Sequence, residues 1–329
     1  MSSPLQAPAL HLSRLSLVPD AQRLSLPAIV PMPLSQVLGA GRDRRFTLPQ
    51  FLVDLPAESG GRTAFFDTGA PPRPQRGALP IVFVHGLAGN VTQWIHVAPA
   101  LASRTRVLGL DLAGHGESAF APRERPYSVA AYARQVAAFM DAVDVDRAIL
   151  VGHSLGGMVA SETAIHFPER VAHAVLVNPA GFSPVPRWLQ SAGHLILRPR
   201  VLEPLLPRVW RWILRQVFQE TNDRTREFIE TCSDTYVLHD IIGIARVMHD
   251  LRHDFMERDL AEELSGSGVA TSIVFGAEDK LVPPKRIRAV RDQVKFTVFD
   301  EIQRCGHMPN IEQPERVIRA LHQVLDSSS

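Results

Sequence analysis

The amino-acid sequence predicts an α/β fold in which a mostly parallel sheet is covered by helices on both faces. Short, almost wholly apolar runs of strand length alternate with helix-like segments between residues 62 and 329, which is the pattern of strands buried on both sides. A helix-like stretch without strands interrupts this alternation between about Gly181 and Leu264. A glycine-flanked serine, Ser154, stands between a strand-like and a helix-like segment.

The composition is that of an ordinary globular protein. Hydrophobic residues make up 45% of the 329 residues and charged residues 21%, which leaves enough apolar surface for a substantial core. The length suits one large catalytic domain with an insert, or two modest domains. The formal net charge is only +1, so the chain lacks the basic excess that polyanion binding requires, and nucleic acid is not expected as a partner.

The sequence shows no sign of a membrane span, a secretory leader or a disulfide framework. No stretch approaches the roughly 18 consecutive apolar residues that cross a bilayer, and the first residues lack the basic start of a signal peptide. The two cysteines, Cys232 and Cys305, stand far apart without a C-x-x-C pair. We therefore expect a cytoplasmic protein with two reduced thiols and without a structural zinc site.

The chain divides into three parts that differ in composition and in hydrophobic pattern. Residues 1–45 are rich in Leu, Pro and Ser and show little periodicity, so we expect a loosely ordered N-terminal extension; a segment that packs on the core or touches a membrane is the alternative. Residues 46–181 and 265–329 carry the alternation of strands and helices and form the predicted core. Residues 182–264 form the predicted helical insert, which is not expected to fold as a separate domain.

Apolar runs and prolines place the elements of the core. The predicted strands have the length and the apolar content typical of buried strands: Arg62–Asp67, Ile81–Val84, Val107–Leu110, Ala148–Val151, Ala174–Val177, Ser272–Phe275 and Phe296–Phe299. The predicted helices lie between them or follow them, and the last two open with a proline in the first turn: Ser128–Val143, Leu155–Phe167, Pro283–Val290 and Pro314–Leu325.

The run Val151-Gly-His-Ser-Leu-Gly-Gly157 contains the pattern G-x-S-x-G. A serine at a tight strand-to-helix turn adopts a strained backbone, and its neighbours two positions away must be small to avoid a clash, as Gly152 and Gly156 are. Ala148–Val151 precedes the motif as a strand and a helix-like segment follows, which is the context that the motif requires. The hydroxyl then lies at a helix N-terminus, which favours developing negative charge. We predict that Ser154 is a nucleophile.

A serine hydroxyl needs a base to take its proton and an acid to orient that base. His307 is the predicted base, because it lies in the loop Cys305-Gly-His-Met-Pro309 between the last strand and the last helix. Asp279 is the predicted acid, in a loop at the end of the penultimate strand. Its neighbour Glu278 offers the same chemistry and stays an alternative.

A glycine-rich turn, His85-Gly-Leu-Ala-Gly-Asn90, follows the predicted strand Ile81–Val84. Such a turn lets backbone N–H groups face a reacting carbonyl. The expected donors to an oxyanion are the backbone N–H groups of Leu87 and of Leu155, the residue after the nucleophile. Losing one donor of this kind typically costs about 3–4 kcal/mol of transition-state stabilisation.

Three side chains near these positions are candidates for the pocket wall, namely His85, Trp94 and His153. For His85 a structural hydrogen-bonding role is the preferred interpretation, and for Trp94 a place in the core. His153 flanks the nucleophile directly.

Together these residues resemble the α/β-hydrolase superfamily. His85-Gly86, Asp111-Leu-Ala-Gly-His-Gly-Glu-Ser118, Gly152-His-Ser-Leu-Gly156, Asp279 and His307 follow one another in the order found in that family, over about residues 62–329. The resemblance implies an eight-stranded, mostly parallel sheet with the triad at the carboxyl ends of the strands. It also implies that residues 182–264 are a helical cap inserted after the sixth strand, that Asp111–Ser118 is a structural turn, and that no metal or organic cofactor is needed.

Ser154, at the turn between the predicted strand and helix, limits the subfamilies that the chain resembles. Haloalkane dehalogenases and epoxide hydrolases that resemble this chain carry aspartate there, so Ser154 argues against both. The chain resembles serine esterases and lipases with a Gly-His-Ser-Leu-Gly elbow. Carbon–carbon bond hydrolases and some perhydrolases also use serine and stay open as alternatives.

The first half of the insert is apolar, aromatic and basic. Its arginines are opposed only by Glu203 up to Phe218, and they are Arg187, Arg198, Arg200, Arg208, Arg211 and Arg215. One interpretation is a basic amphipathic surface that contacts anionic lipid. The preferred interpretation is a cap helix that buries its tryptophans while the arginines reach toward water. An apolar cap favours a hydrophobic acyl or alcohol part in the substrate.

We therefore expect a serine hydrolase that cleaves small-molecule carboxylic esters through an acyl-enzyme on Ser154. An acyltransferase that excludes water and a carbon–carbon bond hydrolase that prefers a carboxylate-bearing substrate use the same triad. A ligand-binding module without turnover is the rival from another class, and the intact triad argues against it. Weak contact with a membrane surface, through the cap or the N-terminal extension, would make the cytoplasmic protein peripheral to a membrane.

Overall fold

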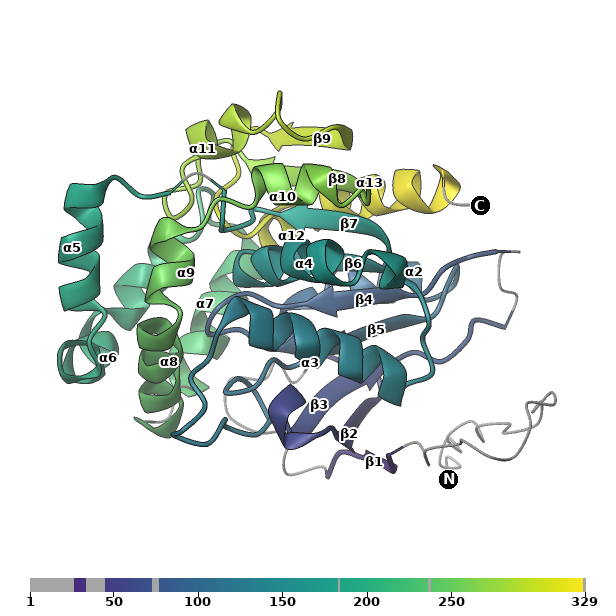
Figure 1. Ribbon diagram of the computed structural model, residues 1–329, viewed down its shortest axis with the longest axis horizontal. Coiled ribbons are helices and arrows are strands. Elements are labelled where there is room, and N and C mark those ends of the chain that lie inside the picture. Colours follow the sequence, from purple (N-terminus) through teal and green to yellow (C-terminus); the bar gives the residue numbers. More distant parts are fainter. Residues whose placement is uncertain (1–26, 34–44, 73–76, 183, 236–237, 328–329) are drawn as a thin grey trace.

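A computed structural model describes residues 27–33, 45–72, 77–182, 184–235 and 238–327, without the side chains of residues 233–242 (Figure 1). Within these residues the strands form one sheet of nine strands in the order β1-β2-β3-β5-β4-β6-β7-β8-β9. Their bounds are Ile29–Pro31 (β1), Gln50–Asp54 (β2), Arg62–Asp67 (β3), Ile81–Val84 (β4), Val107–Leu110 (β5), Ala148–His153 (β6), Val171–Val177 (β7), Ala270–Gly276 (β8) and Phe296–Ile302 (β9).

The sheet is parallel from β5 through β9, whereas β1, β2 and β3 join its edge antiparallel. The prediction of a mostly parallel sheet is thus confirmed, and each predicted strand is present. One strand is added to the eight that the resemblance implies. Ile29–Pro31 pairs with Phe51–Val53, although it lies in the extension expected to be loosely ordered. Residues 1–26 and 34–44 of that extension lie outside the described residues.

The helices follow the predicted pattern in the core and fill the insert. Core helices and short 3₁₀ turns are Ala57–Ser59 (η1), Val91–Trp94 (η2), Ala98–Leu101 (α2), Val129–Ala142 (α3), Leu155–His166 (α4), Pro168–Arg170 (η3), Pro284–Ala289 (α11), Pro309–Glu312 (α12) and Pro314–Ser327 (α13). Insert helices are Arg187–Ile196 (α5), Pro199–Gln216 (α6), Asp223–Thr235 (α7), Leu238–Asp250 (α8), Arg252–Glu257 (α9) and Ala261–Gly266 (α10).

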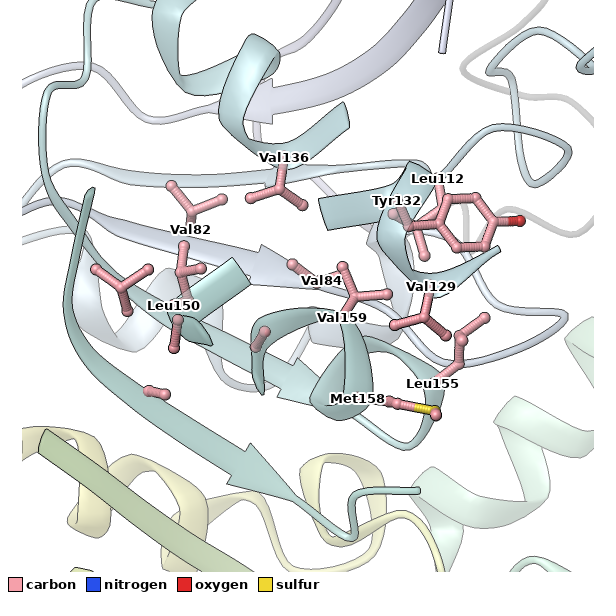
Figure 2. Packing of buried hydrophobic residues seen from close by; sticks show 14 of the residues in the cluster. Val82, Val84, Leu112, Val129, Tyr132, Val136, Leu150, Leu155, Met158 and Val159 are labelled. Atoms are coloured by element: carbon pink, nitrogen blue, oxygen red, sulfur yellow. The ribbon is translucent and has the colours of Figure 1, made fainter. Parts of the chain in front are cut away.

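Alternate residues of each central strand face opposite sides of the sheet. Val82 and Val84 of β4 belong to a core that also holds α3 and α4, as Figure 2 shows. Ile81 and Phe83 belong to a second core, which holds η2, α2 and α13. Because helices cover both faces, every residue of β4 is buried, and this explains why the strands read as continuous apolar runs without polar alternation.

Helices α5 to α9 of the insert gather at one end of the sheet, whereas α10 packs beside α4 (Figure 1). None of the described helices has the length and apolar content needed to cross a bilayer. The expectation that the insert buries its tryptophans is wrong for two of them, because Trp188 is 74% and Trp212 is 63% exposed. Trp210 is partly buried and faces the interior cavity described below.

Candidate active site

The predicted site residues gather because their strands are parallel. Ser154 follows β6, Asn178 follows β7, Asp279 lies just beyond β8 and His307 lies beyond β9. Gly86 follows β4 in the same way. The carboxyl ends of parallel strands meet at one edge of a sheet, which is where ligands bind in open α/β folds. Residues that are far apart in sequence are therefore brought to one place.

Ser154 occupies a strained turn between β6 and α4. Its backbone has φ of +53° and ψ of −113°, a region that non-glycine residues rarely adopt. Hydrogen bonds hold it there: the Ser154 N–H donates to the carbonyl of Val177 at 3.0 Å, and its carbonyl accepts from the N–H groups of Gly157 and Ala180. The strain is thus compensated by neighbouring backbone, as is typical of a functional turn.

The flanking glycines are required by space. A Cβ at Gly152 would collide with the backbone of Gly156, and a Cβ at Gly156 would collide with the carbonyl oxygens of Val84 and His85. These contacts are with backbone, which does not move aside as a flexible side chain does. The spacing of the G-x-S-x-G pattern thus follows from the close approach of α4 to the end of β4.

Replacing Gly156 with alanine is expected to lower the free energy of unfolding by about 3 kcal/mol, because the added methyl overpacks fixed backbone. Urea denaturation measures the change. The matched control is Gly266→Ala, at the end of α10, where an added Cβ meets nothing within 4 Å. There we expect a change within about 1 kcal/mol. Equal destabilisation by the two substitutions would contradict the steric explanation.

His307 and Asp279 form a buried pair. The Nδ1 atom of His307 lies 2.7 Å from Oδ2 of Asp279, and both side chains are almost wholly buried. Burial alone raises the pKa of Asp279, but the charge and hydrogen bond of His307, with further hydrogen bonds from Val282 and Asn178, outweigh it and hold that pKa below its ordinary value. Asp279 therefore remains a carboxylate that orients the imidazole.

The two carboxylates left open by the sequence point in different directions. Glu278 accepts a hydrogen bond from the backbone N–H of Cys305 at 3.0 Å, while Asp279 faces His307. Of the two, the structure brings only Asp279 to the imidazole.

His153 holds the loop that carries His307. Its Nε2 lies 2.8 Å from the backbone carbonyl oxygen of His307, and its Nδ1 lies 3.1 Å from Nε2 of Gln93. Because the carbonyl only accepts and the amide nitrogen only donates, the imidazole is neutral with its proton on Nε2. Burial, with the nearby His307, lowers the pKa of His153 to about 3. His153 also lines the cavity beside Ser154.

The residues expected to supply the oxyanion donors lie close to the predicted nucleophile. Leu155 is the first residue of α4, so its N–H has no acceptor within that helix. A Cβ built on Gly86 would lie 3.3 Å from Cβ of Ser154, which places the turn that contains Leu87 against the nucleophile. Leu87 and Ser154 line the same cavity.

The other two candidates for the pocket wall do not line the cavity. The His85 ring is buried, with Nδ1 2.8 Å from the carbonyl oxygen of Gly86 and Nε2 accepting the N–H of Leu112 at 2.9 Å. Trp94 is fully buried and packs on Phe83, with ring centroids 4.5 Å apart. Their assignment as pocket residues is wrong, because both side chains face the core behind the turn. Their preferred structural roles agree with this placement.

A cavity of about 510 Å³ lies between the insert and the carboxyl ends of the strands. Ser154, His153 and His307 line it. Most of the remaining wall is apolar, and part of it comes from the insert: Leu197, Leu206, Trp210, Ile213, Leu214, Val217, Phe228, Ile244, Met248, Phe255 and Met256. No carboxylate lies among its described lining residues, and Arg286 is the one arginine.

Two residues that the sequence did not single out, Asn178 and Gln93, hold the site residues in place. Asn178 donates from Nδ2 to Oδ2 of Asp279 at 2.6 Å and accepts the N–H of Gly276. Gln93 accepts the N–H of Gly86 at 3.2 Å while it donates to His153. Neither residue belongs to a local motif. The one available signal was that Asn178 directly follows a predicted strand.

Glu312 connects the insert, by hydrogen bonds, to the loop that carries His307. Its buried carboxylate accepts the backbone N–H of Gly306 on one oxygen and those of Gln219 and Glu220 on the other. The backbone N–H of His307 donates to the carbonyl of Val217, at the end of α6, at 2.7 Å. The position of His307 therefore depends on where α6 ends.

One group of side chains in the described part of the chain has the composition of a metal site. His194, His253 and Glu257 offer ligand atoms within 4.8 Å of one another. They lie on α5 and α9, partly exposed, and none of them lines the cavity.

Three buried histidines make the folding stability depend on pH, and burial lowers the pKa of one of them, His173, to about 4. Burial lowers the pKa of His115 and of His153 to about 3, whereas a histidine in an unfolded chain has a pKa of about 6.5. Between these values the unfolded state binds more protons, so stability is fully present above about pH 6.5 and is lost as the pH falls toward about 3. We expect each imidazole to lower the free energy of unfolding by about 2 kcal/mol between about pH 6.5 and pH 5.

Urea denaturation over this pH range measures the effect. The variant His115→Gln, which lacks one of these buried imidazoles, is expected to show a smaller slope of the free energy of unfolding against pH. A free energy of unfolding that does not fall between neutral and mildly acidic pH would contradict the prediction.

Comparison with known proteins identifies the family of the chain. Residues 81–320 match the model of the alpha/beta hydrolase family. The chain is 30% identical over 273 residues to the dihydrolipoyllysine-residue acetyltransferase component of an acetoin cleaving system from Pseudomonas putida, covering 79% of this chain and 66% of that protein. The chain spans 61–66% of the length of the two such components that it matches.

Some of the other relatives are hydrolases. A 2-hydroxymuconate semialdehyde hydrolase from Pseudomonas sp. (strain CF600) is 26% identical over 266 residues, which cover 78% of this chain and 88% of that enzyme. The crystal structure of a bacterial membrane phospholipase A superposes with a TM-score of 0.69 at 24% identity, over 87% of this chain and 88% of that one, and this likeness shows the fold alone. Since the family match spans most of the sheet and includes Ser154, Asp279 and His307, the chain belongs to the alpha/beta hydrolase family.

Proposed function

We propose that the chain is a serine hydrolase that cleaves carboxylic esters whose acyl or alcohol part is largely apolar. The observation that carries the proposal is the buried His307–Asp279 hydrogen bond of 2.7 Å at a cavity that Ser154 also lines. A positioned base with an orienting acid is the arrangement that activates a serine hydroxyl. The hydrolases among the relatives support the same reaction class.

In the proposed reaction, His307 takes the proton of the Ser154 hydroxyl as its oxygen attacks the ester carbonyl. The backbone N–H groups of Leu87 and Leu155 donate to the oxyanion that forms. His307 then gives the proton to the departing alcohol, which leaves an acyl group on Ser154. Water, deprotonated by His307, releases the acid and restores the hydroxyl. Asp279 stabilises the imidazolium in both halves.

The shape and lining of the cavity favour an apolar substrate. Its volume of about 510 Å³ falls within the range of small-molecule sites. Leu206, Ile213 and Met248 offer dispersion contacts and no hydrogen bonds. A neutral acyl chain or a hydrophobic alcohol enters such a wall without leaving a polar group unpaired.

Arg286 supports a second candidate function. As the one arginine among the described residues that line the cavity, it offers a partner for a substrate carboxylate. A carbon–carbon bond hydrolase acting on a dienone acid would use such a pair, and one relative is named as a semialdehyde hydrolase. The two functions differ in the bond that is cleaved, ester C–O or C–C, and in whether the substrate carries a carboxylate.

A panel of nitrophenyl esters of increasing chain length, with a dienone acid beside it, tests the proposal. We expect kcat/KM to rise with chain length until the cavity is filled and then to fall. The Ser154→Ala variant is expected to be inactive on every member. Turnover of the dienone acid without ester cleavage would replace the proposal by the second candidate.

Two further measurements address the remaining rivals. Added alcohol acceptors that capture most of the acyl group would identify an acyltransferase. Absence of a covalent adduct with a fluorophosphonate probe would identify a binding module without turnover.

A further inference from the structure

We propose that the outward side of helices α5 and α6 docks on an anionic lipid bilayer. This surface, called the α5–α6 face here, consists of the exposed apolar side chains of residues 188–212 and the exposed arginines among residues 187–215. It lies outside the cavity, and the docking does not depend on the chemistry proposed for Ser154.

Exposed apolar side chains are concentrated on the α5–α6 face. Eleven large hydrophobic residues are exposed among those the structure describes, and seven of them lie between residues 188 and 212. The most exposed are Trp188, Trp212, Leu195 and Ile196. Soluble surfaces carry single apolar residues without consequence, but a gathered set marks an interaction site. Tryptophan is enriched where a membrane meets water, since its ring is apolar and its N–H is polar.

Helix α6 separates two apolar sides. Val201, Leu205 and Trp212 are exposed and share one side of the helix, at spacings of four and seven residues. Leu206 and Ile213 directly follow Leu205 and Trp212, about 100° further around the helix, and they line the cavity. Burial in the fold therefore explains the inner side and leaves the outer apolar side without a reason in the described structure.

Arginines accompany the exposed apolar side chains. Arg187, Arg198, Arg200, Arg208, Arg211 and Arg215 are all exposed, and none of them forms an ion pair with a carboxylate among the described residues. Elsewhere, Arg106 pairs with Asp67 and Arg316 with Asp300. Because the whole chain carries a net charge of only +1, this is a local concentration of positive charge.

Charge complementarity selects an anionic bilayer as the occupant. Arginine side chains extend from an apolar surface to phosphate groups while their stems stay in contact with lipid. A second copy of this chain would bring the same arginines to a symmetric interface, where like charges oppose association. A bilayer supplies both an apolar layer for Trp188 and Trp212 and negative charge for the arginines.

Docking would place the cavity close to lipid, because α6 carries the α5–α6 face on one side and part of the cavity wall on the other. Lipid esters as the substrate class follow from this placement, and that step rests on the proposed function.

The test is flotation of the full chain with vesicles, using the Ser154→Ala variant so that no lipid is cleaved. We expect binding to phosphatidylcholine vesicles that contain phosphatidylglycerol, release by added salt, and no binding to phosphatidylcholine alone. Arg208→Gln/Arg211→Gln/Arg215→Gln is expected to lower the vesicle affinity about 100-fold, at about 1 kcal/mol for each arginine. Trp188→Ser/Trp212→Ser is expected to weaken binding and to remove a blue shift of the tryptophan emission.

The matched control removes the same positive charge from exposed positions elsewhere, as Arg147→Gln/Lys295→Gln/Arg319→Gln, and should bind like the parent chain. Absence of binding to anionic vesicles at low salt would overturn the proposal, and so would equal loss in the control. Concentration-dependent self-association without lipid that the tryptophan variant abolishes would instead assign the face to a second copy. Because binding is measured without turnover, these outcomes do not depend on the proposed ester hydrolysis.

Discussion

Replacing Ser154 with alanine is expected to lower kcat for ester hydrolysis on the order of 10⁶-fold, because the attacking oxygen is lost and His307 and Asp279 act only through it. His307 and Asp279 keep their hydrogen bond in this variant, but they cannot rescue the reaction because no hydroxyl is left for His307 to deprotonate. Residual activity would come from the backbone N–H donors and from binding. Initial rates with the preferred nitrophenyl ester, together with labelling by a fluorophosphonate, measure the loss.

Ser161 provides a matched control on the same helix. It is buried in α4, and its hydroxyl donates to the carbonyl of Gly157 at 2.9 Å. Ser161→Ala also removes a serine hydroxyl, but one that does not line the cavity, and it should leave kcat within a few-fold of the parent. If Ser154→Ala were to retain the activity of the parent chain, the assignment of the nucleophile would be wrong.

The second large effect is expected for Asp279→Asn, which should lower kcat about 10⁴-fold. Oδ1 of Asp279 accepts the backbone N–H groups of Leu281 and Val282, so the carbonyl oxygen of the asparagine must stay on that side. Its amide nitrogen then faces His307 Nδ1. A donor at this place forces the imidazole into the tautomer with the proton on Nε2, and that tautomer cannot accept the proton of Ser154.

The pH dependence of kcat and the thermal unfolding of the variant separate loss of the tautomer from loss of the fold. Glu278→Gln is the matched control, since it removes the neighbouring carboxylate and leaves His307 and its partner in place. We expect that variant to keep most of its activity. A larger loss in Glu278→Gln than in Asp279→Asn would exchange the roles of the two carboxylates.

Local patterns predicted the elements well. The apolar runs at Ile81–Val84 and Ala148–Val151 became central parallel strands, and the Gly152 and Gly156 positions proved to be required by backbone contacts. Such features depend on neighbours within a few residues or on a strand that is buried on both faces, so the sequence expresses them directly.

Other features depended on contacts between distant segments. Trp188 and Trp212 were expected to be buried, since large aromatic residues usually are. The orientation of α5 and α6 instead exposes both side chains on the surface. The support that Asn178 and Gln93 give to the site joins residues about 60 to 100 positions apart. No periodicity or motif encodes a partner at that separation.

The sequence by itself determined the fold class and predicted Ser154, Asp279 and His307 as candidate site residues, because strand, turn and helix are each specified by short stretches of chain. The tertiary structure decided which carboxylate meets His307, which side chains line the cavity and which side of α6 faces water. Those outcomes depend on the direction in which a side chain leaves its own element and on what a distant element places opposite it, and hydrophobic patterning alone specifies neither.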